Sequence, residues 1–341
     1  MEQLGGITGP VAGRVPDTAL KHSRIAGTGR YLPDRVLTNQ DLERIVDTSD
    51  EWIRTRTGME RRHMASDEQA SSDLAVPAAR AALEAANCSP DEIDLVVVGT
   101  TTPDLVFPNV GCLVQKALDI PPCAAFSCEA ACTGWLYAMS VADGMIRLGR
   151  ANKALVVGVE VLSRITDWSD RSTCVLFGDG AGAVVLEPAE EPGMMSFILG
   201  ADGNYVDILR SRAGVSRNPA ELGDGGLAVR MKGNEVFKIA VRTMGRTVDQ
   251  LLERHGLDRG AIDWLIPHQA NLRIIQAIGK RLRLPDERVV LTVQDHGNTG
   301  AASIPLALDV AIRDGRIRRG QRIMMVSFGG GLTWAAGLMQ F

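Results

Sequence analysis

Ile93-Asp94-Leu95-Val96-Val97-Val98 has a near copy in Ile262-Asp263-Trp264-Leu265-Ile266-Pro267, 169 positions downstream. At an offset of 166, Cys132-Thr133-Gly134 matches Asn298-Thr299-Gly300, and residues 145–150 match residues 311–316. The change of three residues in the offset corresponds to one small deletion in a loop. Because the matches share their order and nearly share their offset, the sequence favours a duplicated half over chance similarity.

Both predicted halves alternate helices with short buried strands. The predicted order is helix, strand, helix, strand in each half: 74–86, 95–99, 133–148 and 154–159, then 236–254, 264–267, 299–313 and 322–327. Short apolar strands separated by helices indicate an α/β fold whose parallel or mixed sheets are covered by helices.

The acidic stretch 187–193, which contains proline and glycine, is the natural boundary between the halves. We therefore expect an N-terminal half, 24–190, that carries Cys132, and a C-terminal half, 191–341, that carries His268 and Asn298. Residues 1–23 are rich in glycine, carry charges and lack a hydrophobic core segment. They predict a flexible extension and not a signal peptide.

Composition excludes several classes of protein. The 341 residues are 45% hydrophobic and 23% charged, which is typical of a globular protein. The net charge of −4 gives no indication of nucleic-acid binding, and the longest apolar runs are too short to span a membrane. Six cysteines without CxxC or CxxH spacing indicate reduced thiols in the cytoplasm, with no metal site.

Cys132 lies between an apolar stretch and a helix-like run, so we expect it near a helix N-terminus. The helix dipole and a nearby imidazole would lower the pKa of such a thiol. Pseudo-twofold packing of the halves would bring Cys132 and its counterpart Asn298 towards one cleft. His268 follows a buried strand end, where ligand sites of α/β sheets gather. A Cys, a His and an Asn together predict acyl transfer through a thioester.

Each of these residues alone is more often a core or capping residue than a catalyst. The order Cys, His, Asn also occurs in papain-like proteases, and His268 lies 136 residues after Cys132. However, the papain-type sequence around the Cys and a disulfide framework are both missing, and that fold does not explain the duplication. The set of residues on the duplicated frame therefore favours acyl transfer over proteolysis.

Five motifs in this order resemble β-ketoacyl-acyl carrier protein synthase III, a condensing enzyme of the thiolase superfamily. They cover the chain from about residue 24 to its end: Asp50-Glu51-Trp52-Ile53-Arg54-Thr55-Arg56-Thr57-Gly58, Glu129-Ala130-Ala131-Cys132-Thr133-Gly134, Pro267-His268-Gln269-Ala270-Asn271, His296-Gly297-Asn298-Thr299-Gly300-Ala301-Ala302-Ser303 and Ser327-Phe328-Gly329-Gly330-Gly331. The resemblance implies a duplicated thiolase-like α/β fold with two mixed β-sheets in a five-layer αβαβα arrangement.

The implied reaction is a decarboxylative Claisen condensation that initiates type II fatty acid synthesis. Cys132 would take the acyl group of an acyl-CoA, by default acetyl-CoA, while the backbone N–H groups of Cys132 and Gly330 hold the oxyanion. Malonyl-acyl carrier protein would then lose CO₂, and His268 and Asn298 would stabilise the enolate. Decarboxylation makes the carbanion, so no metal or redox cofactor is implied.

The resemblance also assigns residues that bind the substrates. It implies CoA contacts at Trp52, Arg56, Arg171 and Asn234, of which Trp52 and Arg171 hold the adenine. Phe107 would reach across a homodimer to close the acyl pocket. Trp135, just after the nucleophile, either packs in the helix core or shapes that pocket. Basic residues also recur at helical spacing in two predicted helices. Such a stripe is usually a solvated face, but in a chain that is acidic overall these cations would dock an acidic carrier protein: Lys238, Arg242, Arg246, Arg273, Lys280 and Arg281.

Some alternatives stay open. Glu129 and Trp135 stand where the family commonly has small residues, which leaves the length and branching of the primer undecided. The rival functions are of two kinds. One is a related condensing enzyme: an enzyme of secondary metabolism that uses longer acyl or malonyl-CoA substrates, a chalcone-synthase-like enzyme or a 3-hydroxy-3-methylglutaryl-CoA-synthase-like enzyme. The other is a non-condensing acyl binder. A binder would have no need of Cys132, His268 and Asn298.

Overall fold

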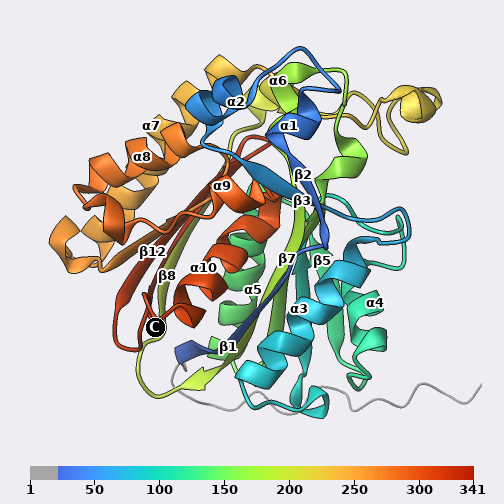
Figure 1. Cartoon of the computed structure of the whole chain (residues 1–341). Coiled ribbons are helices and arrows are strands. Elements are labelled where there is room, and N and C mark those ends of the chain that lie inside the picture. Colours follow the sequence, from blue (N-terminus) through green and yellow to red (C-terminus); the bar gives the residue numbers. More distant parts are fainter. Residues whose placement is uncertain (1–21) are drawn as a thin grey trace, which may run out of the picture.

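The computed structural model describes residues 22–341. It contains two large β-sheets, each with helices on both faces (Figure 1). The layers run from α7 (Gly233–Arg254) and α8 (Leu272–Leu282), through the first sheet, to α5 (Gly134–Arg147) and α10 (Ser303–Arg313) at the centre. The second sheet and the outer helices α3 (Ser71–Ala85) and α4 (Val110–Ala117) follow. The predicted five-layer αβαβα arrangement is confirmed.

The two sheets have the same pattern of strand pairing. One has the order β1-β7-β6-β4-β5, with β4 parallel to β5 and β6, and β7 antiparallel to β6 and β1. The other has the order β11-β12-β13-β8, with β11 parallel to β12 and the remaining pairs antiparallel. Their strands are β1 (His22–Tyr31), β4 (Leu95–Gly99), β5 (Ala124–Cys128), β6 (Ala154–Val161), β7 (Asp179–Ala189), β8 (Met194–Ala201), β11 (Trp264–Pro267), β12 (Arg322–Gly329) and β13 (Thr333–Gln340).

The duplication seen in the sequence is visible in this topology. A parallel bridge between Leu265 and Val289 occupies the position beside β11 that β5 occupies beside β4. The central helices α5 and α10, which begin just after the matched Cys132 and Asn298 motifs, both lie between the sheets. The same order of elements in both halves brings the two motifs towards each other.

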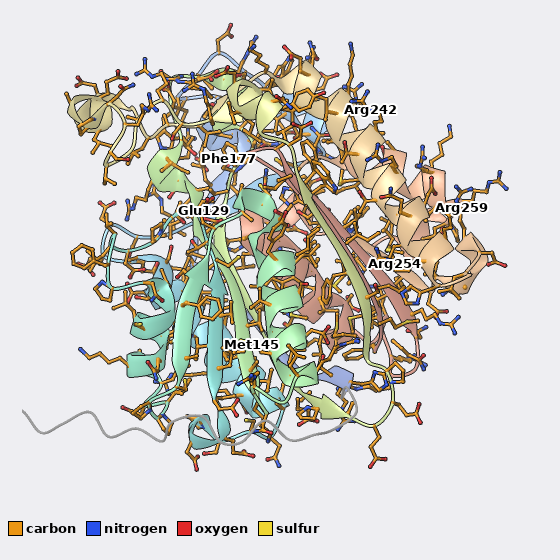
Figure 2. The ribbon with its side chains drawn as sticks, turned by 180° about the vertical axis from the view of Figure 1, so that it is seen from behind. Glu129, Met145, Phe177, Arg242, Arg254 and Arg259 are labelled. Carbon is orange, nitrogen blue, oxygen red and sulfur yellow. The ribbon has the colours of Figure 1, made fainter. Side chains whose placement is uncertain are left out.

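Shorter elements surround the ends of the sheets. They are α1 (Asn39–Leu42), α2 (Asp50–Thr57), α6 (Arg171–Cys174), α9 (Val293–His296), β2 (Arg35–Thr38), β3 (Arg61–Met64), β9 (Leu209–Arg210) and β10 (Arg230–Met231). Arg242 and Arg254 mark the course of α7 along the flank of the molecule (Figure 2). No helix of the described residues is both long and apolar enough to cross a membrane.

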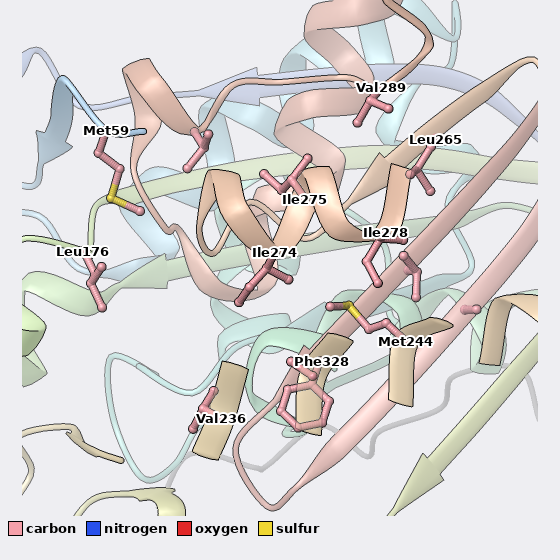
Figure 3. Packing of buried hydrophobic residues seen from close by; sticks show 14 of the residues in the cluster. Met59, Leu176, Val236, Met244, Leu265, Ile274, Ile275, Ile278, Val289 and Phe328 are labelled. Carbon is pink, nitrogen blue, oxygen red and sulfur yellow. The ribbon is translucent and has the colours of Figure 1, made fainter. Parts of the chain in front are cut away.

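Burial explains why the strands read as continuous apolar runs. Every residue of β4 and of β6 is buried, since helices cover both faces of their sheet. On α8 the apolar residues recur at helical spacing, so that Ile274, Ile275 and Ile278 face the core. They belong to the same cluster as Met244 of α7 and Phe328 of β12 (Figure 3).

The predicted N-terminal extension is two residues too long. Strand β1 begins at His22, and Ser23 is fully buried, with its hydroxyl donating to Asp143 Oδ1 at 2.7 Å. The rest of that extension, 1–21, lies outside the described residues. Near the predicted boundary, β7 ends at Ala189 in one sheet and β8 begins at Met194 in the other. This passage between sheets supports our proposal of halves at 24–190 and 191–341.

Candidate active site

A cavity of about 810 Å³ brings together residues far apart in the sequence. Cys132, His268 and Asn298 all line it, as does Gly330. Cys132 comes from the short 3₁₀ turn Ala131–Thr133 before α5, His268 follows β11, and Asn298 precedes the turn Gly300–Ala302 that leads into α10. The three side chains expected to act on one thioester therefore face one space.

The turn that carries Cys132 is held from several sides. Ala131 has φ +48°, a left-handed conformation that an alanine adopts only when its surroundings impose it. The carbonyl oxygen of Cys132 accepts a hydrogen bond from Ser327 Oγ at 2.8 Å. A Cβ added at Gly329 would lie 2.7 Å from the backbone N of Cys132, so β12 approaches this turn closely. The position of the nucleophile and its N–H depends on that glycine.

The pKa of the Cys132 thiol is raised, whereas the sequence predicted that it would be lowered. Burial raises the pKa of Cys132 to about 12, and the negative charge of Glu160 adds to the increase. The prediction of a lowered pKa was therefore wrong for the free protein. It rested on the helix dipole and on a nearby imidazole, but burial lowers the pKa of His268 to about 4 and keeps its ring neutral.

His268 is 3% exposed and its ring is fixed by Ser303. Its Nδ1 lies 2.6 Å from Ser303 Oγ, which also accepts the backbone N–H of Gln269 at 3.4 Å. Because that hydroxyl already accepts one bond, its own proton is available for Nδ1. The proton of the neutral ring would then sit on Nε2 as a donor.

Asn298 is oriented in a similar way by its own backbone. Its Oδ1 accepts the N–H of Gly300 at 2.9 Å, which directs the amide nitrogen elsewhere as a donor. Its backbone N–H donates to Leu176 O at 2.8 Å, and its carbonyl accepts from Gly178 N at 3.0 Å. The site thus offers two neutral donors, suited to an oxygen that becomes negatively charged during a reaction.

Glu160 is a further cavity residue that the sequence reading missed. It is fully buried on β6, and burial raises its pKa to about 7. Hydroxyl groups and one backbone N–H from Thr101 and Thr102 donate to its carboxylate. The available signal was a single carboxylate within an otherwise apolar buried strand. Ser303, which orients His268, was within a quoted motif but had no assigned role.

The ionisation of Glu160 predicts a dependence of stability on pH. Its pKa is near 4.5 when unfolded and about 7 when folded, so the folded state binds more protons between these values. The contribution of Glu160 is full below about pH 4.5 and is lost as the pH rises through 7, by on the order of 3 kcal/mol. The substitution Glu160→Gln removes this pH-dependent contribution to the free energy of unfolding.

Chemical denaturation of the native protein and of Glu160→Gln at about pH 5 and pH 8 measures this contribution of Glu160 to the free energy of unfolding. The free energy of unfolding of the native protein, relative to Glu160→Gln, should be lower at pH 8 than at pH 5. An unchanged difference between the two proteins would show that Glu160 has no raised pKa.

Three of the four residues expected to bind CoA line the cavity. The guanidinium groups of Arg56 and Arg171 lie 4.7 and 4.9 Å from the centre of the Trp52 ring on α2. Trp52, Arg56 and Asn234 line the cavity, whereas Arg171 contacts it through Trp52. An aromatic ring flanked by two cations suits a flat base with phosphate groups.

Neither residue expected at the acyl pocket lines the cavity. Trp135 is 1% exposed and packs in the core between the sheets, because its side of α5 faces inward. Of its two expected positions, the helix core and the acyl pocket, Trp135 therefore occupies the core. Phe107 is 82% exposed and is not among the residues that line the cavity. Glu129, by contrast, lines the cavity, and its Oε1 accepts the N–H of Ala131 at 3.3 Å.

The cations expected to dock a carrier protein are exposed on α7 and α8. Arg273 also lines the cavity and lies over the Phe237 ring. Arg281 forms an ion pair with Asp249 at 2.6 Å, which leaves it less available to a partner than the others. Lys238, Arg242 and Lys280 have no ion pair among the described residues.

Comparisons with known proteins show which family this chain resembles. Sequence models of 3-oxoacyl-[acyl-carrier-protein (ACP)] synthase III and of its C-terminal region match residues 126–203 and 252–341. The β-ketoacyl-[acyl-carrier-protein] synthase III of Thioalkalivibrio sulfidiphilus is 57% identical over 322 residues, covering 94% of this chain and all of that protein.

Solved structures show the same fold over nearly the whole chain. The 3-oxoacyl-[acyl-carrier-protein] synthase III of Aquifex aeolicus is 46% identical, with a TM-score of 0.88 over 94% of this chain and 100% of the other. The priming β-ketosynthase of the R1128 polyketide biosynthetic pathway is 36% identical, with a TM-score of 0.91 over 97% and 99%. The chain therefore belongs to the β-ketoacyl-acyl carrier protein synthase III family of acyl-transferring, thiolase-like condensing enzymes.

Proposed function

We propose that this protein condenses an acyl-CoA primer with malonyl-acyl carrier protein through an acyl-enzyme on Cys132. The products are a β-ketoacyl-acyl carrier protein, CoA and CO₂, and with acetyl-CoA the reaction initiates type II fatty acid synthesis. The observation that carries the proposal is the single cavity shared by Cys132, His268 and Asn298. We place the reaction in the cytoplasm, in line with six free cysteines.

In the first half-reaction the sulfur of Cys132 attacks the thioester carbonyl of the primer. The developing oxyanion would accept hydrogen bonds from the backbone N–H groups of Cys132 and Gly330, and the collapse of the tetrahedral intermediate releases CoA. The close approach of Gly329 to the Cys132 nitrogen supports this role, since it fixes the two segments that carry the donors.

In the second half-reaction the malonyl group loses CO₂ and its thioester oxygen becomes an enolate. We assign the stabilisation of this oxygen to His268 Nε2–H and to Asn298 Nδ2. Both groups are neutral and already oriented, by Ser303 and by Gly300, so they need little reorganisation when the charge appears. The carbanion then attacks the acyl group on Cys132, and no resident cofactor enters this scheme.

The CoA part of the primer would extend along the cavity to Trp52. We propose that Trp52 and Arg171 hold the adenine, and that Arg56 and Asn234 contact the rest of the nucleotide and the pantetheine arm. The Asn271 Nδ2 donates to Arg56 O at 3.1 Å, which ties α2 to the start of α8. This bond supports a fixed distance between the CoA end and the reacting end.

We further propose a homodimer. Strand β5 is at the edge of its sheet, and most of its residues are only half-buried. Leu105, Val106 and Phe107 are consecutive, apolar and 54, 70 and 82% exposed. An unpaired edge strand next to an exposed apolar loop favours association with a second copy. In that arrangement Phe107 would close the acyl pocket of the partner.

We propose that the carrier protein docks on the cations of α7 and α8: Lys238, Arg242, Arg273, Lys280 and Arg281. Changing both Lys238 and Arg242 to Glu should raise the KM for malonyl-carrier protein roughly tenfold, because it reverses the charge that attracts an acidic partner. Steady-state kinetics with each substrate varied in turn measure this.

Acylation by acetyl-CoA, which does not involve the carrier protein, should be unchanged in that variant. Lys116→Glu on α4 is the matched control, because Lys116 is equally exposed but on the opposite outer layer. A KM for malonyl-carrier protein that stays at the native value would contradict docking on this face.

Incubation with acetyl-CoA, followed by mass measurement of the intact protein, tests the proposed function. One acetyl group should be added, and peptide mapping should place it on Cys132. Cys132→Ala should gain none. An acetylated Cys132→Ala protein, or no adduct on the native protein, would contradict a Cys132 acyl-enzyme and favour a non-condensing acyl binder.

A role in secondary metabolism is the second candidate, because the polyketide-priming ketosynthase has the same fold over nearly its full length. The cavity has many apolar residues along its walls, including Leu209, Met231 and Ile274, which suit an acyl chain. A panel of acyl-CoA primers of increasing length, with malonyl-carrier protein as co-substrate and product mass as the readout, separates the two candidates. A preference for acetyl-CoA favours fatty acid synthesis, and a preference for longer chains favours the alternative.

A further inference from the structure

Glu160 is a carboxyl group for which the proposed reaction has no role so far. It is fully buried on β6, yet it lines the cavity. Its oxygens are surrounded by hydroxyl groups: Thr101 Oγ1 at 3.0 Å, Thr102 Oγ1 at 2.7 Å and Thr100 Oγ1 at 3.4 Å. Within the described residues no lysine, arginine or histidine pairs with it. A buried carboxyl group without a cation favours its protonated form.

Glu160 is also close enough to Cys132 for its charge to affect the thiol. Its negative charge is the second cause of the raised pKa of Cys132. A Cβ added at Gly300 would lie 2.8 Å from Glu160 Cγ, so the carboxyl group packs directly against the segment that carries Asn298. It therefore packs beside the Asn298 segment, in the same cavity that Cys132 lines.

The condensation leaves a proton deficit at the sulfur. Loss of CO₂ transfers the negative charge of the malonyl carboxylate to the enolate, and the attack moves it to a tetrahedral oxyanion. When this intermediate collapses, the C–S bond breaks and the charge stays on Cys132 as a thiolate. Because the Cys132 pKa is about 12, the thiolate takes up one proton in each cycle at neutral pH.

Few groups around the sulfur can supply that proton. Glu129 also lines the cavity, but its Oε1 accepts the backbone N–H of Ala131 at 3.3 Å. His268 is neutral, since burial lowers its pKa to about 4. Asp179 of the neighbouring strand β7 directs its carboxylate to Ser163 and Ala65 instead. Arg56 and Arg273 are permanently charged and give up no proton. Glu160 has a pKa of about 7 and thus carries a proton in a large share of molecules at neutral pH.

We propose that Glu160 donates its proton to the sulfur of Cys132 while the C–S bond of the tetrahedral intermediate breaks. The O–H bond of the carboxyl group breaks and an S–H bond forms on Cys132, so the negative charge moves to Glu160. Solvent in the open cavity then returns a proton to the carboxylate, which accounts for the one proton that the overall reaction consumes. This inference rests on the proposed function and adds a proton donor to it.

A single-turnover experiment tests the step. Acetylated protein, freed of acetyl-CoA, is mixed with malonyl-carrier protein between about pH 5.5 and pH 9, and product formation is followed by mass. For the native protein the rate should fall as the pH rises through about 7, because the protonated form of Glu160 is needed. Glu160→Gln should be slower by roughly 10²-fold at the lowest pH and should show no fall near pH 7.

Two further variants distinguish this role from a structural one. Glu160→Asp keeps a carboxyl group and should keep a fall in rate with pH. Asp179→Asn removes another buried carboxyl group that has similar hydroxyl and N–H donors but does not line the cavity, and its pH profile should match the native one.

Acylation by acetyl-CoA gives a readout that a general loss of structure would also lower. It should be no slower in Glu160→Gln, because removal of a negative charge eases ionisation of the thiol. A native pH profile in Glu160→Gln, or an equal loss of acylation and condensation, would overturn the proposal. If the native protein formed no acyl-enzyme, the proposed function itself would fail, which is a different result.

Discussion

Replacing either His268 or Asn298 with alanine is expected to slow condensation of the preformed acyl-enzyme by roughly 10²- to 10³-fold. Acylation of Cys132 should stay within about tenfold of the native rate. The reason is the place where charge develops: the enolate oxygen needs both side-chain donors, whereas the oxyanion of acylation is held by the backbone N–H groups of Cys132 and Gly330. Quenched-flow measurement of each half-reaction gives the two rates.

His255→Ala is a matched control for His268→Ala, since His255 lies at the end of α7 and does not line the cavity. Both half-reactions should keep their native rates in that variant. An equal loss of acylation and decarboxylation in His268→Ala and Asn298→Ala would contradict the division of roles. It would mean that these side chains position Cys132 instead of stabilising the enolate.

Gly329→Ala should reduce acylation of Cys132 by roughly 10²-fold or more. Its Cβ would lie 2.7 Å from the Cys132 nitrogen and 3.2 Å from the Ala131 Cβ, so the turn that carries the nucleophile must move. Movement of that turn takes one oxyanion donor out of place. Acylation by acetyl-CoA, followed by intact mass over time, measures the loss.

Gly337→Ala on the adjacent strand β13 is the control. A Cβ there meets the ring of Phe197 at 3.0 Å, a side chain that can shift by a few tenths of an ångström. Acylation should remain near the native rate, and thermal melting of both variants checks that they fold. A Gly329→Ala protein that is acylated at the native rate would show that the position of the Cys132 N–H does not limit catalysis.

The sequence was most informative where a local pattern determines the structure. The apolar run at 95–99 became β4 with the predicted bounds, because a strand buried on both faces has no polar positions. The helix after Cys132 was expected over 133–148 and runs from Gly134 to Arg147. The internal repeat also indicated correctly that Cys132 and Asn298 would face a common space.

The missed features depend on contacts between distant segments. The raised pKa of Cys132 comes from burial and from Glu160 on another strand, neither of which is visible in the sequence around the Cys. Trp135 follows the nucleophile closely in sequence, but its position on α5 turns it into the core. Ser23 looked like part of a loose tail, yet its hydroxyl is buried against Asp143, 120 residues away.

The discharge of the acyl-enzyme tests most directly whether the three residues act on one thioester. Protein acetylated on Cys132 is mixed with malonyl-carrier protein labelled in its free carboxyl group, and released CO₂, remaining acetyl-enzyme and carrier-bound product are measured together. We predict one CO₂ and one acetoacetyl-carrier protein for each acetyl group lost from Cys132. Release of CO₂ without loss of the acetyl group, or loss of that group as free acetate, would contradict carbon–carbon bond formation at this site.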